Sequence, residues 1–275
     1  MAAAGSHEII VVDNAFSDGS LGLARSLWPG VRTLSLADNR GYAAGVNAGQ
    51  AVADESSDLL VLNPDVRLGP GSLSALLESA KAAPAGIGIV VPRLCDPNRN
   101  LLRSLRREPT VMRALGEALL GGELGGRIPA FGEVIHDQAE YQKARRVTWA
   151  SGAAMLISRE CWEAAGPWDE SFFLYSDEVD FALRARDAGF GVFREPNATA
   201  IHVGGEAHVD PELWALLKVN RVRLFARRHG TTKSIAFWLA VMLGEGLRAI
   251  VGQSLHHAAF LKLMRQGPHD RGRVP

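Results

Sequence analysis

The sequence predicts an α/β fold in which a mostly parallel sheet is flanked by helices. Three observations lead to this prediction. Short runs of β-branched apolar residues alternate with stretches whose apolar residues recur at helical intervals. Polar residues stop the apolar runs, as in strands that are buried on both faces of a sheet. The chain has 275 residues, 47% of them hydrophobic, so it can bury one large core and still carry an additional segment.

Strand and helix patterns alternate most regularly at the start of the chain. Strands are predicted at residues 8–14, 31–36, 59–65 and 87–92. Helices are predicted at residues 21–27, in a stretch of small residues that ends near Ala53, and at residues 72–82. Because strand and helix alternate, we expect these strands to lie parallel. Pro92 is expected to end the fourth strand, since proline cannot donate a hydrogen bond to a sheet.

Residues 98–146 lack a strict period and contain several arginines and two Gly-Gly pairs. We interpret this stretch as a long loop that covers the site of the protein. Arg103, Arg106 and Arg107 lie within it, and two interpretations stay open for them. They contact an anionic ligand such as a diphosphate, or they form a solvated basic surface.

The regular pattern returns after residue 146. A strand is predicted at 147–157, a helix at 158–166 that ends with Gly166, an amphipathic helix at 181–189, extended segments at 191–195 and 198–202, and a helix at 211–229. We therefore expect a first domain over residues 1–230. An amphipathic helical segment and a basic tail are expected over residues 231–275.

Composition excludes several classes of protein. Lys and Arg balance Asp and Glu at a formal net charge of zero, so no nucleic-acid partner is expected. Cys95 and Cys161 are far apart and lack metal-ligand spacing, so neither a disulfide framework nor a zinc site is indicated. The start of the chain does not look like a secretory signal, and the protein is expected in the cytoplasm.

The last apolar segment, residues 235–264, is interrupted by charged residues such as Glu245 and Arg248. It is therefore not expected to span a bilayer. Two interpretations stay open. The segment lies as an amphipathic helix on the cytoplasmic face of a membrane, or it packs against the rest of the chain or a second copy in a homodimer.

The first of three polar clusters follows the first predicted strand. It contains Asp13, Asn14 and Asp18, with Gly19 providing a tight turn. Ligands bind outside the carboxyl ends of parallel strands, so these side chains are placed to hold a nucleoside and its ribose. An ordinary helix-capping turn explains them equally well.

The second cluster, Asn63, Pro64 and Asp65, ends the third predicted strand. A carboxylate at this position suits Mg²⁺ or Mn²⁺, which one or two protein carboxylates hold together with substrate phosphates. A turn formed by these residues is the alternative. His202, at the end of a later extended segment, can complete the metal site or simply pack at the surface.

The third cluster places Asp177, Glu178 and Asp180 at the start of a helix. Capping, the helix dipole and an ion pair between Asp180 and Arg184 explain part of it. Crowded carboxylates resist simultaneous ionisation, so one of them with a raised pKa could act as a general base. Among the nearby aromatic residues, Trp168 is the candidate for stacking on an acceptor, although such residues more often belong to the core.

Together these motifs resemble family 2 glycosyltransferases, especially their rhamnosyltransferase-like branch, over roughly residues 8–230. Each motif is weak alone, whereas the ordered set is specific. The matching segments are residues 11–20, 39–47, 62–65, 166–170 and 173–184.

The resemblance implies a GT-A fold and assigns site residues. It places Asp65 as a metal ligand with His202. The family's Glu-Asp pair falls on Asp177 and Glu178 in exchanged order, which makes Glu178 the expected base and Asp177 the reserve. Asp180 joins Trp168 as an acceptor contact. The expected donor contacts are Asp13, Asn14, Asp18, Asn39, Gly41, Asn47 and Asn63.

The implied activity is metal-dependent, inverting sugar transfer in cell-envelope polysaccharide synthesis. A UDP-, dTDP- or GDP-linked sugar is the expected donor, and a glycan or lipid-linked molecule the acceptor. The family normally begins with an additional strand and helix, which this sequence lacks before residue 8. An inactive relative that binds nucleotides or a partner subunit is therefore the main alternative. A nucleotidyltransferase would need a Gly-rich basic loop after its first strand, and none is found.

Overall fold

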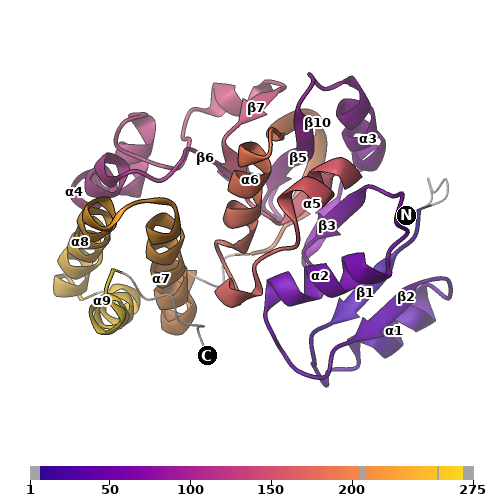
Figure 1. Cartoon of the computed structure of the whole chain (residues 1–275), viewed down its shortest axis with the longest axis horizontal. Coiled ribbons are helices and arrows are strands. Elements are labelled where there is room, and N and C mark those ends of the chain that lie inside the picture. Colours follow the sequence, from indigo (N-terminus) through magenta and orange to yellow (C-terminus); the bar gives the residue numbers. More distant parts are fainter. Residues whose placement is uncertain (1–6, 205–207, 253, 269–275) are drawn as a thin grey trace.

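Sheets and a separate group of helices form the protein in the computed structural model, which describes residues 7–204, 208–252 and 254–268 (Figure 1). The chain begins with a small α/β unit, shown in indigo and violet. Its elements are β1 (Ile10–Asp13), α1 (Ser20–Leu27), β2 (Arg32–Ser35) and α2 (Tyr42–Val52). β1 pairs with β2 in parallel, as predicted, with Asp13 opposite Ser35.

The larger sheet is mixed. Its strands are β3 (Leu59–Leu62), β4 (Val66–Leu68), β5 (Ile87–Cys95), β7 (Arg145–Val147), β9 (Ala154–Ile157) and β10 (Gly191–His202). The order is β3-β9-β5-β10-β4, with β7 also on β10. Only β5 and β10 pair in parallel here. The α/β class is confirmed, but β3 does not lie parallel to a neighbour, because the fully buried strand β9 enters between β3 and β5.

Helices cover both faces of this sheet. Along β9 and β5, alternate residues point to opposite faces. Leu156 and Val90 pack against Leu76 of α3 (Ser72–Ala82), whereas Met155 and Ile89 belong to the core under α5 (Arg159–Ala165) and α6 (Asp177–Asp187). The two cores therefore place α5 and α6 on one face of the sheet and α3 on the other.

Pro92 does not end its strand, because β5 continues to Cys95. The reason lies in the partner strand. Val91 is paired with Arg194 and Arg93 with Thr199, so the register of β10 shifts opposite Pro92. No ladder hydrogen bond is required from a proline at that point.

The predicted loop over residues 98–146 is wrong in its middle part, which forms α4 (Val111–Arg127). Thr110 caps this helix by accepting a hydrogen bond from the amide of Arg113. Of its glycines, Gly121 has a φ of 78° and kinks the helix, whereas Gly116 and Gly125 allow close packing. A Cβ added to Gly116 would lie 2.3 Å from the carbonyl oxygen of Phe131. The remaining elements of this stretch are β6 (Leu105–Arg106), which pairs with β8 (Trp149–Ala150), and a 3-10 helix (Gln138–Gln142).

The carboxyl-terminal part of the chain joins α4 in a group of helices beside the sheets (Figure 1). This group contains α7 (Pro211–Arg228), α8 (Thr231–Ile250) and α9 (Ser254–Gln266). Phe237 of α8 is fully buried among Ala114 of α4, Val222 of α7 and Leu263 of α9. The predicted domain boundary near residue 230 falls between two helices of this group. Residues 269–275 of the predicted basic tail lie outside the described residues.

In the described part of the chain, no helix has the length and apolar character needed to cross a bilayer.

Candidate functional site

Pairing of β4 with β10 brings the second polar cluster to His202. The register places His202 opposite Val66, directly after Asp65. As a result, Nε2 of His202 lies 3.3 Å from Oδ2 of Asp65. The Nδ2 atom of Asn63 lies 3.5 Å from the same imidazole nitrogen, and the amide of Gly204 donates to Asp65 at 2.8 Å. Residues far apart in sequence therefore form one polar corner.

The third cluster begins α6, as predicted. The turn before it carries three non-glycine residues with positive φ, namely Phe173, Tyr175 and Ser176. Such conformations are costly and cluster at functional sites. Here the turn delivers Asp177 to a buried position, with 2% of its surface exposed, and leaves Glu178 partly exposed.

The two carboxyl groups differ in their ionisation. Burial, and then the neighbouring Glu178, raise the pKa of Asp177 well above its usual value, and Oδ2 of Asp177 has no partner among the described residues. Burial also raises the pKa of Glu178, although a hydrogen bond from Asp177 and the charge of Arg106 oppose this effect. Asp177 is thus the carboxyl group that retains a proton, and Glu178 is the one that ionises first.

Tyr42 links the second and third clusters, and the sequence analysis missed it. Its hydroxyl oxygen is buried and has no hydrogen-bond partner among the residues that the structure describes. Burial raises the pKa of Tyr42, and the negative charges of Asp177, Glu178 and Asp65 raise it further. The phenol therefore lies within electrostatic reach of both carboxylate groups. The segment 39–47 contains this tyrosine but does not indicate that it lies near the acids. That position results from where α2 begins, since Tyr42 is its first residue.

Arg106 is the second residue without an assignment from the sequence. It is partly buried on β6, its guanidinium lies 5.8 Å from the ring of Trp149, and its charge acts on Glu178. Burial lowers the pKa of Arg106, and the surrounding acids counteract this effect. Of the three arginines of the predicted loop, it is the one that the structure connects to the acids of α6.

Part of the predicted donor set comes together between β1 and α2. The side chain of Asn14 donates to Asn39 at 2.9 Å and to the carbonyl oxygen of Gly41 at 2.8 Å. Gly41 has a φ of 91°, and a Cβ there would lie 2.1 Å from the carbonyl oxygen of Phe173. Glycine at this position therefore lets the start of α2 touch the turn that precedes Asp177.

Asp13 and Asp18 lie in the turn after β1. Asp13 accepts from the amide of Phe16, and Asp18 accepts from the amide of Ser20, at 2.9 Å in each case. The hydrogen bonds with Ser20 hold the pKa of Asp18 below its usual value. Both carboxylates thus shape the turn, and their contact with a nucleotide stays a prediction.

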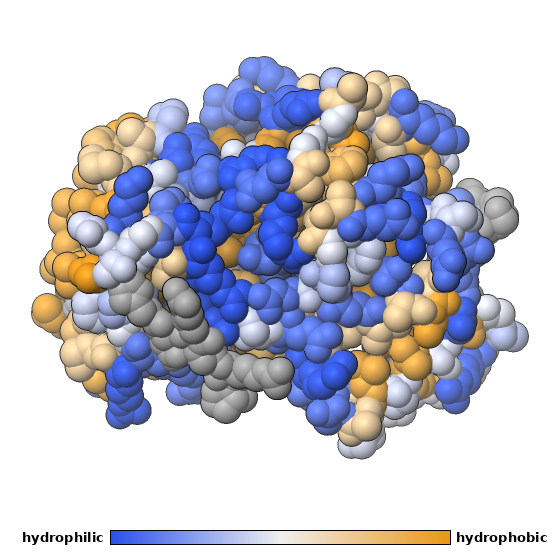
Figure 2. Space-filling view, viewed as in Figure 1, coloured by the Kyte–Doolittle hydropathy of each residue, from blue (hydrophilic) through white to orange (hydrophobic). Residues whose placement is uncertain are grey.

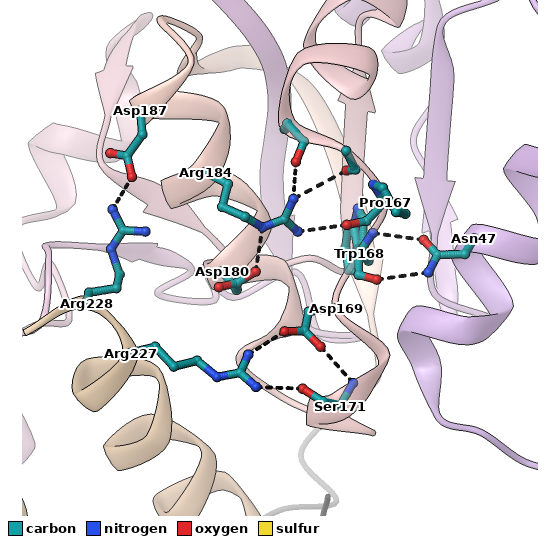
Figure 3. Close-up of polar contacts among 12 residues, drawn as sticks. Asn47, Pro167, Trp168, Asp169, Ser171, Asp180, Arg184, Asp187, Arg227 and Arg228 are labelled. Atoms are coloured by element: carbon teal, nitrogen blue, oxygen red, sulfur yellow. Dashed lines mark hydrogen bonds and ion pairs between the residues drawn. The ribbon is translucent and has the colours of Figure 1, made fainter. Parts of the chain in front are cut away.

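The remaining predicted residues hold the site in place (Figure 3). Asn47 donates to the carbonyl oxygen of Trp168 and accepts from its amide, both at 2.9 Å. Asp180 pairs with Arg184 at 2.7 Å, and Arg184 also donates to the carbonyl oxygen of Pro167 at 2.9 Å. These contacts anchor the segment before the strained turn.

Trp168 lies in the core and is not open to an acceptor. Only 2% of its surface is exposed. Its ring stacks on Phe181 at 5.5 Å and contacts Tyr42 at 5.9 Å. The aromatic run before α6 therefore packs under the site.

Asp65 and His202 fit a divalent cation. Their facing atoms, a carboxylate oxygen and an imidazole nitrogen, are ligand types that Mn²⁺ and Mg²⁺ accept. Among the described residues, no third His, Cys, Asp or Glu completes a ligand group. An ion held here would need further oxygen ligands from substrate phosphates or water.

The sequence is similar to those of known proteins. Residues 4–136 match the family described as glycosyl transferase family 2. The chain is 32% identical over 204 residues to the N-acetylglucosaminyl-diphospho-decaprenol L-rhamnosyltransferase of Mycobacterium tuberculosis, covering 70% of this chain and 66% of that protein. It is 28% identical over 204 residues to the low-salt glycan biosynthesis hexosyltransferase Agl10 of Haloferax volcanii, covering 72% of this chain and 59% of that protein. The chain spans slightly less than two thirds of the first relative's length.

Two solved structures share the fold. A mannosyltransferase from Pyrobaculum calidifontis, in complex with GDP-Man and Mn²⁺, matches with a TM-score of 0.53 and 17% identity over 94% of this chain and 70% of that one. The GalNAc-T7 structure with UDP, GalNAc and Mn²⁺ matches with a TM-score of 0.52 and 13% identity over 92% of this chain and 48% of that one. At these identities the likeness concerns the fold alone, and it confirms the predicted GT-A fold.

Proposed function

Because the chain belongs to glycosyl transferase family 2, we propose that it moves a rhamnose-like or other hexose from a nucleotide diphosphate to a glycan or lipid-linked acceptor, in cell-envelope polysaccharide synthesis. The related M. tuberculosis protein is named for a decaprenyl-diphosphate-linked acceptor, which supports a lipid-linked acceptor for this chain. The donor nucleotide is UDP, dTDP or GDP.

The pair of carboxyl groups at the start of α6 carries this proposal. Glu178 is partly exposed and is the group that ionises first, so it is the base that removes a proton from the acceptor hydroxyl. Asp177 keeps its proton and donates to Glu178, which orients the base. The deprotonated acceptor oxygen attacks the anomeric carbon of the sugar from the side opposite the leaving diphosphate. The configuration at that carbon therefore inverts.

Asp65 and His202 are the residues that would hold a divalent cation. When bound, such a cation neutralises negative charge on the diphosphate. The donor's nucleoside is expected against Asp13, Asn14 and Asn39, at the end of β1. Tyr42 lies between this region and the acids and is an additional candidate for contact with the donor.

Binding of the donor can be tested without knowing the acceptor. The thermal stability of the chain is measured with UDP, dTDP and GDP, each with and without Mn²⁺, for the wild type and for Asp65→Ala. A ligand that binds the native state at 100 times its Kd stabilises it by about 2.7 kcal/mol. A Mn²⁺-dependent stabilisation that Asp65→Ala abolishes supports the proposed site, and its absence with all three nucleotides contradicts it.

A second candidate function is nucleotide binding without turnover. The observation that favours it is the division of the sheet, since β1 pairs only with β2 and β3 only with β9 among the described strands. Release of nucleoside diphosphate from a sugar nucleotide, in the presence of Mn²⁺ and an acceptor extract, separates the two functions. Turnover that Glu178→Gln abolishes identifies an enzyme, whereas a nucleotide-induced stabilisation without turnover identifies a binding protein.

A further inference from the structure

The outer surface of α8 is apolar from Ile235 to the end of the helix. After Lys233, each residue of α8 that is exposed to solvent is Ile or Leu. These residues recur three or four positions apart, which places them along one side of the helix. They are Ile235, Leu239, Leu243, Leu247 and Ile250. A helix that faces water normally carries polar residues on its outer side, and α8 has none there after Lys233.

The neighbouring helix α4 extends this surface. The two helices touch closely, because a Cβ added to Gly244 would lie 3.1 Å from the Cα of Ala118. Leu119, Leu120 and Leu124 of α4 are exposed beside this contact. Together with the five residues of α8 they form the α4–α8 apolar face. Figure 2 shows hydrophobic residues along this margin of the molecule, at its left. Exposed apolar clusters of this kind mark interaction sites.

The charges around the α4–α8 apolar face are mostly positive, and the exposed carboxylate of Glu123 on α4 is paired with Arg127. The only carboxylate of α8, Glu245, is buried and paired with Lys218 at 3.2 Å. By contrast, Lys233, Arg248 and Arg113 contact no carboxylate in the described part of the chain. The guanidinium of Arg248 donates only to the carbonyl oxygens of Gly244 and Glu117, at 2.7 and 2.6 Å.

A cavity lined by both basic and acidic residues adjoins the end of α4. Its volume is about 570 Å³, and Arg127 and Pro129 from the end of α4 line it. Four further arginines contribute to its wall: Arg107, Arg145, Arg146 and Arg186. The carboxylates of Glu108, Asp137 and Glu140 also line it, and Glu108 pairs with Arg186 and Glu140 with Arg145. Arginines outnumber carboxylates in this wall, so together with Lys233, Arg113 and Arg248 they leave an excess of positive charge beside the face. Such an excess attracts anionic headgroups.

We propose that the α4–α8 apolar face inserts into the interfacial region of a bilayer that contains anionic lipids. The proposal rests on the proposed function in one respect, namely that a lipid-linked acceptor is presented at such a surface. Helix α7 connects the face to the site. The side chain of Asn220 on α7 donates to the carbonyl oxygens of Phe172 and Leu174 at 2.8 Å, at the start of the strained turn and within it. Binding to a bilayer would therefore fix the orientation of Asp177 and Glu178 relative to its surface.

The test is flotation of the full chain with vesicles of phosphatidylcholine alone or mixed with phosphatidylglycerol, without acceptor or sugar nucleotide. The double variant Leu239→Glu with Leu243→Glu removes apolar area from the face. The matched control, Leu23→Glu with Leu27→Glu, changes two leucines of α1 that are similarly exposed, at 61% and 57%. We expect the wild type and the control to float with the anionic vesicles. The α8 variant should partition roughly 100-fold less, since each leucine loses several buried CH₂ groups.

Thermal unfolding of both variants checks that they fold, because all four leucines are exposed. Two outcomes overturn the proposal. Either the wild type floats with no vesicle composition, or the α8 variant floats as well as the control. Loss of a dimer in the α8 variant, without vesicle binding by the wild type, assigns the face to a second copy instead. Nucleotide-induced stabilisation, measured without lipid, tells failure of this proposal apart from failure of the proposed function.

Discussion

Glu178 and Asp177 are adjacent in sequence but have different surroundings, and this difference predicts their separate effects on catalysis. Glu178→Gln keeps the shape of the side chain and removes the base, so we expect kcat to fall roughly 10²- to 10⁴-fold. Nucleotide-induced stabilisation should persist. Asp177→Asn can still donate to Glu178 and is the matched control. A larger loss in Asp177→Asn than in Glu178→Gln would contradict this assignment of the base.

The raised pKa of Glu178 also predicts a pH profile. A base must be ionised to act, so activity should rise with pH through a pKa above that of an ordinary glutamate. Measurement of kcat against pH locates this limb.

Tyr42 offers a test that separates a ligand contact from a structural role. Its hydroxyl oxygen is buried and lacks a hydrogen-bond partner in the described part of the chain, so Tyr42→Phe removes an unsatisfied polar group. We expect the free energy of unfolding to stay equal or to rise by up to about 1 kcal/mol. If the hydroxyl contacts the donor, the KM for the sugar nucleotide rises in the same variant. A loss of stability without a change in KM would show that the hydroxyl serves the fold.

At the scale of secondary structure, two glycines at the start of α2 predict opposite results. Gly41→Ala forces a Cβ to within 2.1 Å of the carbonyl oxygen of Phe173 at a positive φ. It should destabilise the protein by at least about 1–3 kcal/mol and disturb the turn before Asp177. Gly45→Ala, inside the same helix with open space around it, should stabilise by up to about 1 kcal/mol. Chemical denaturation of both variants checks the contrast, and equal effects would contradict it.

Glu245 joins three helices and gives a pH-dependent prediction. From α8 it accepts from Trp214 of α7 at 2.9 Å, pairs with Lys218 of α7 and lies 2.6 Å from His256 of α9. Burial raises the pKa of Glu245, but the charge of Lys218 and these hydrogen bonds outweigh burial and hold it below the ordinary value of 4.5. Glu245→Gln leaves Lys218 without its partner and should cost about 3 kcal/mol at neutral pH.

The stability that ionised Glu245 contributes is fully present above pH 4.5 and is lost as pH falls through its lowered pKa. The difference between wild type and Glu245→Gln should therefore shrink in acid. Urea denaturation at several pH values measures it. A difference that is independent of pH would mean that the charge of Glu245 does not stabilise the helix group.

At the scale of the whole molecule, local patterns predicted what local forces decide. Residues 72–82 were predicted as a helix and form α3 with the same bounds, because their apolar residues recur at helical intervals. The three polar clusters were found because strand ends and helix starts carry recognisable residues. Asp65 and His202 were assigned to one site by resemblance, and β4 and β10 bring them together.

What the sequence did not predict depends on contacts between distant residues. Strand β9 lies between β3 and β5 and pairs antiparallel with both. The apolar pattern of Ala154–Ile157 predicts a strand but not which strands it pairs with. Helix α4 escaped prediction because Gly116 and Gly125 serve close packing against Phe131, while Gly121 only kinks the helix at a positive φ. Tyr42 and Arg106 owe their place in the site to burial beside the acids of α6, which neither the motif around Tyr42 nor the sequence around Arg106 indicates.

The division into two sheets has a consequence for amide hydrogen exchange. Among the described strands, β1 and β2 share no hydrogen bonds with the larger sheet, so residues 7–36 can open as a cooperative unit while α2, which packs in the main core, and the rest stay folded. We expect the amides of β1 and β2 to exchange faster than those of β5, β9 and β10. A nucleotide held by Asp13 and Asn14 should slow the exchange of that unit alone. Part of the binding free energy of the nucleotide would then offset the free energy of closing this unit. The measured affinity for the donor would therefore depend on the local stability of the unit as well as on the contacts with the nucleotide.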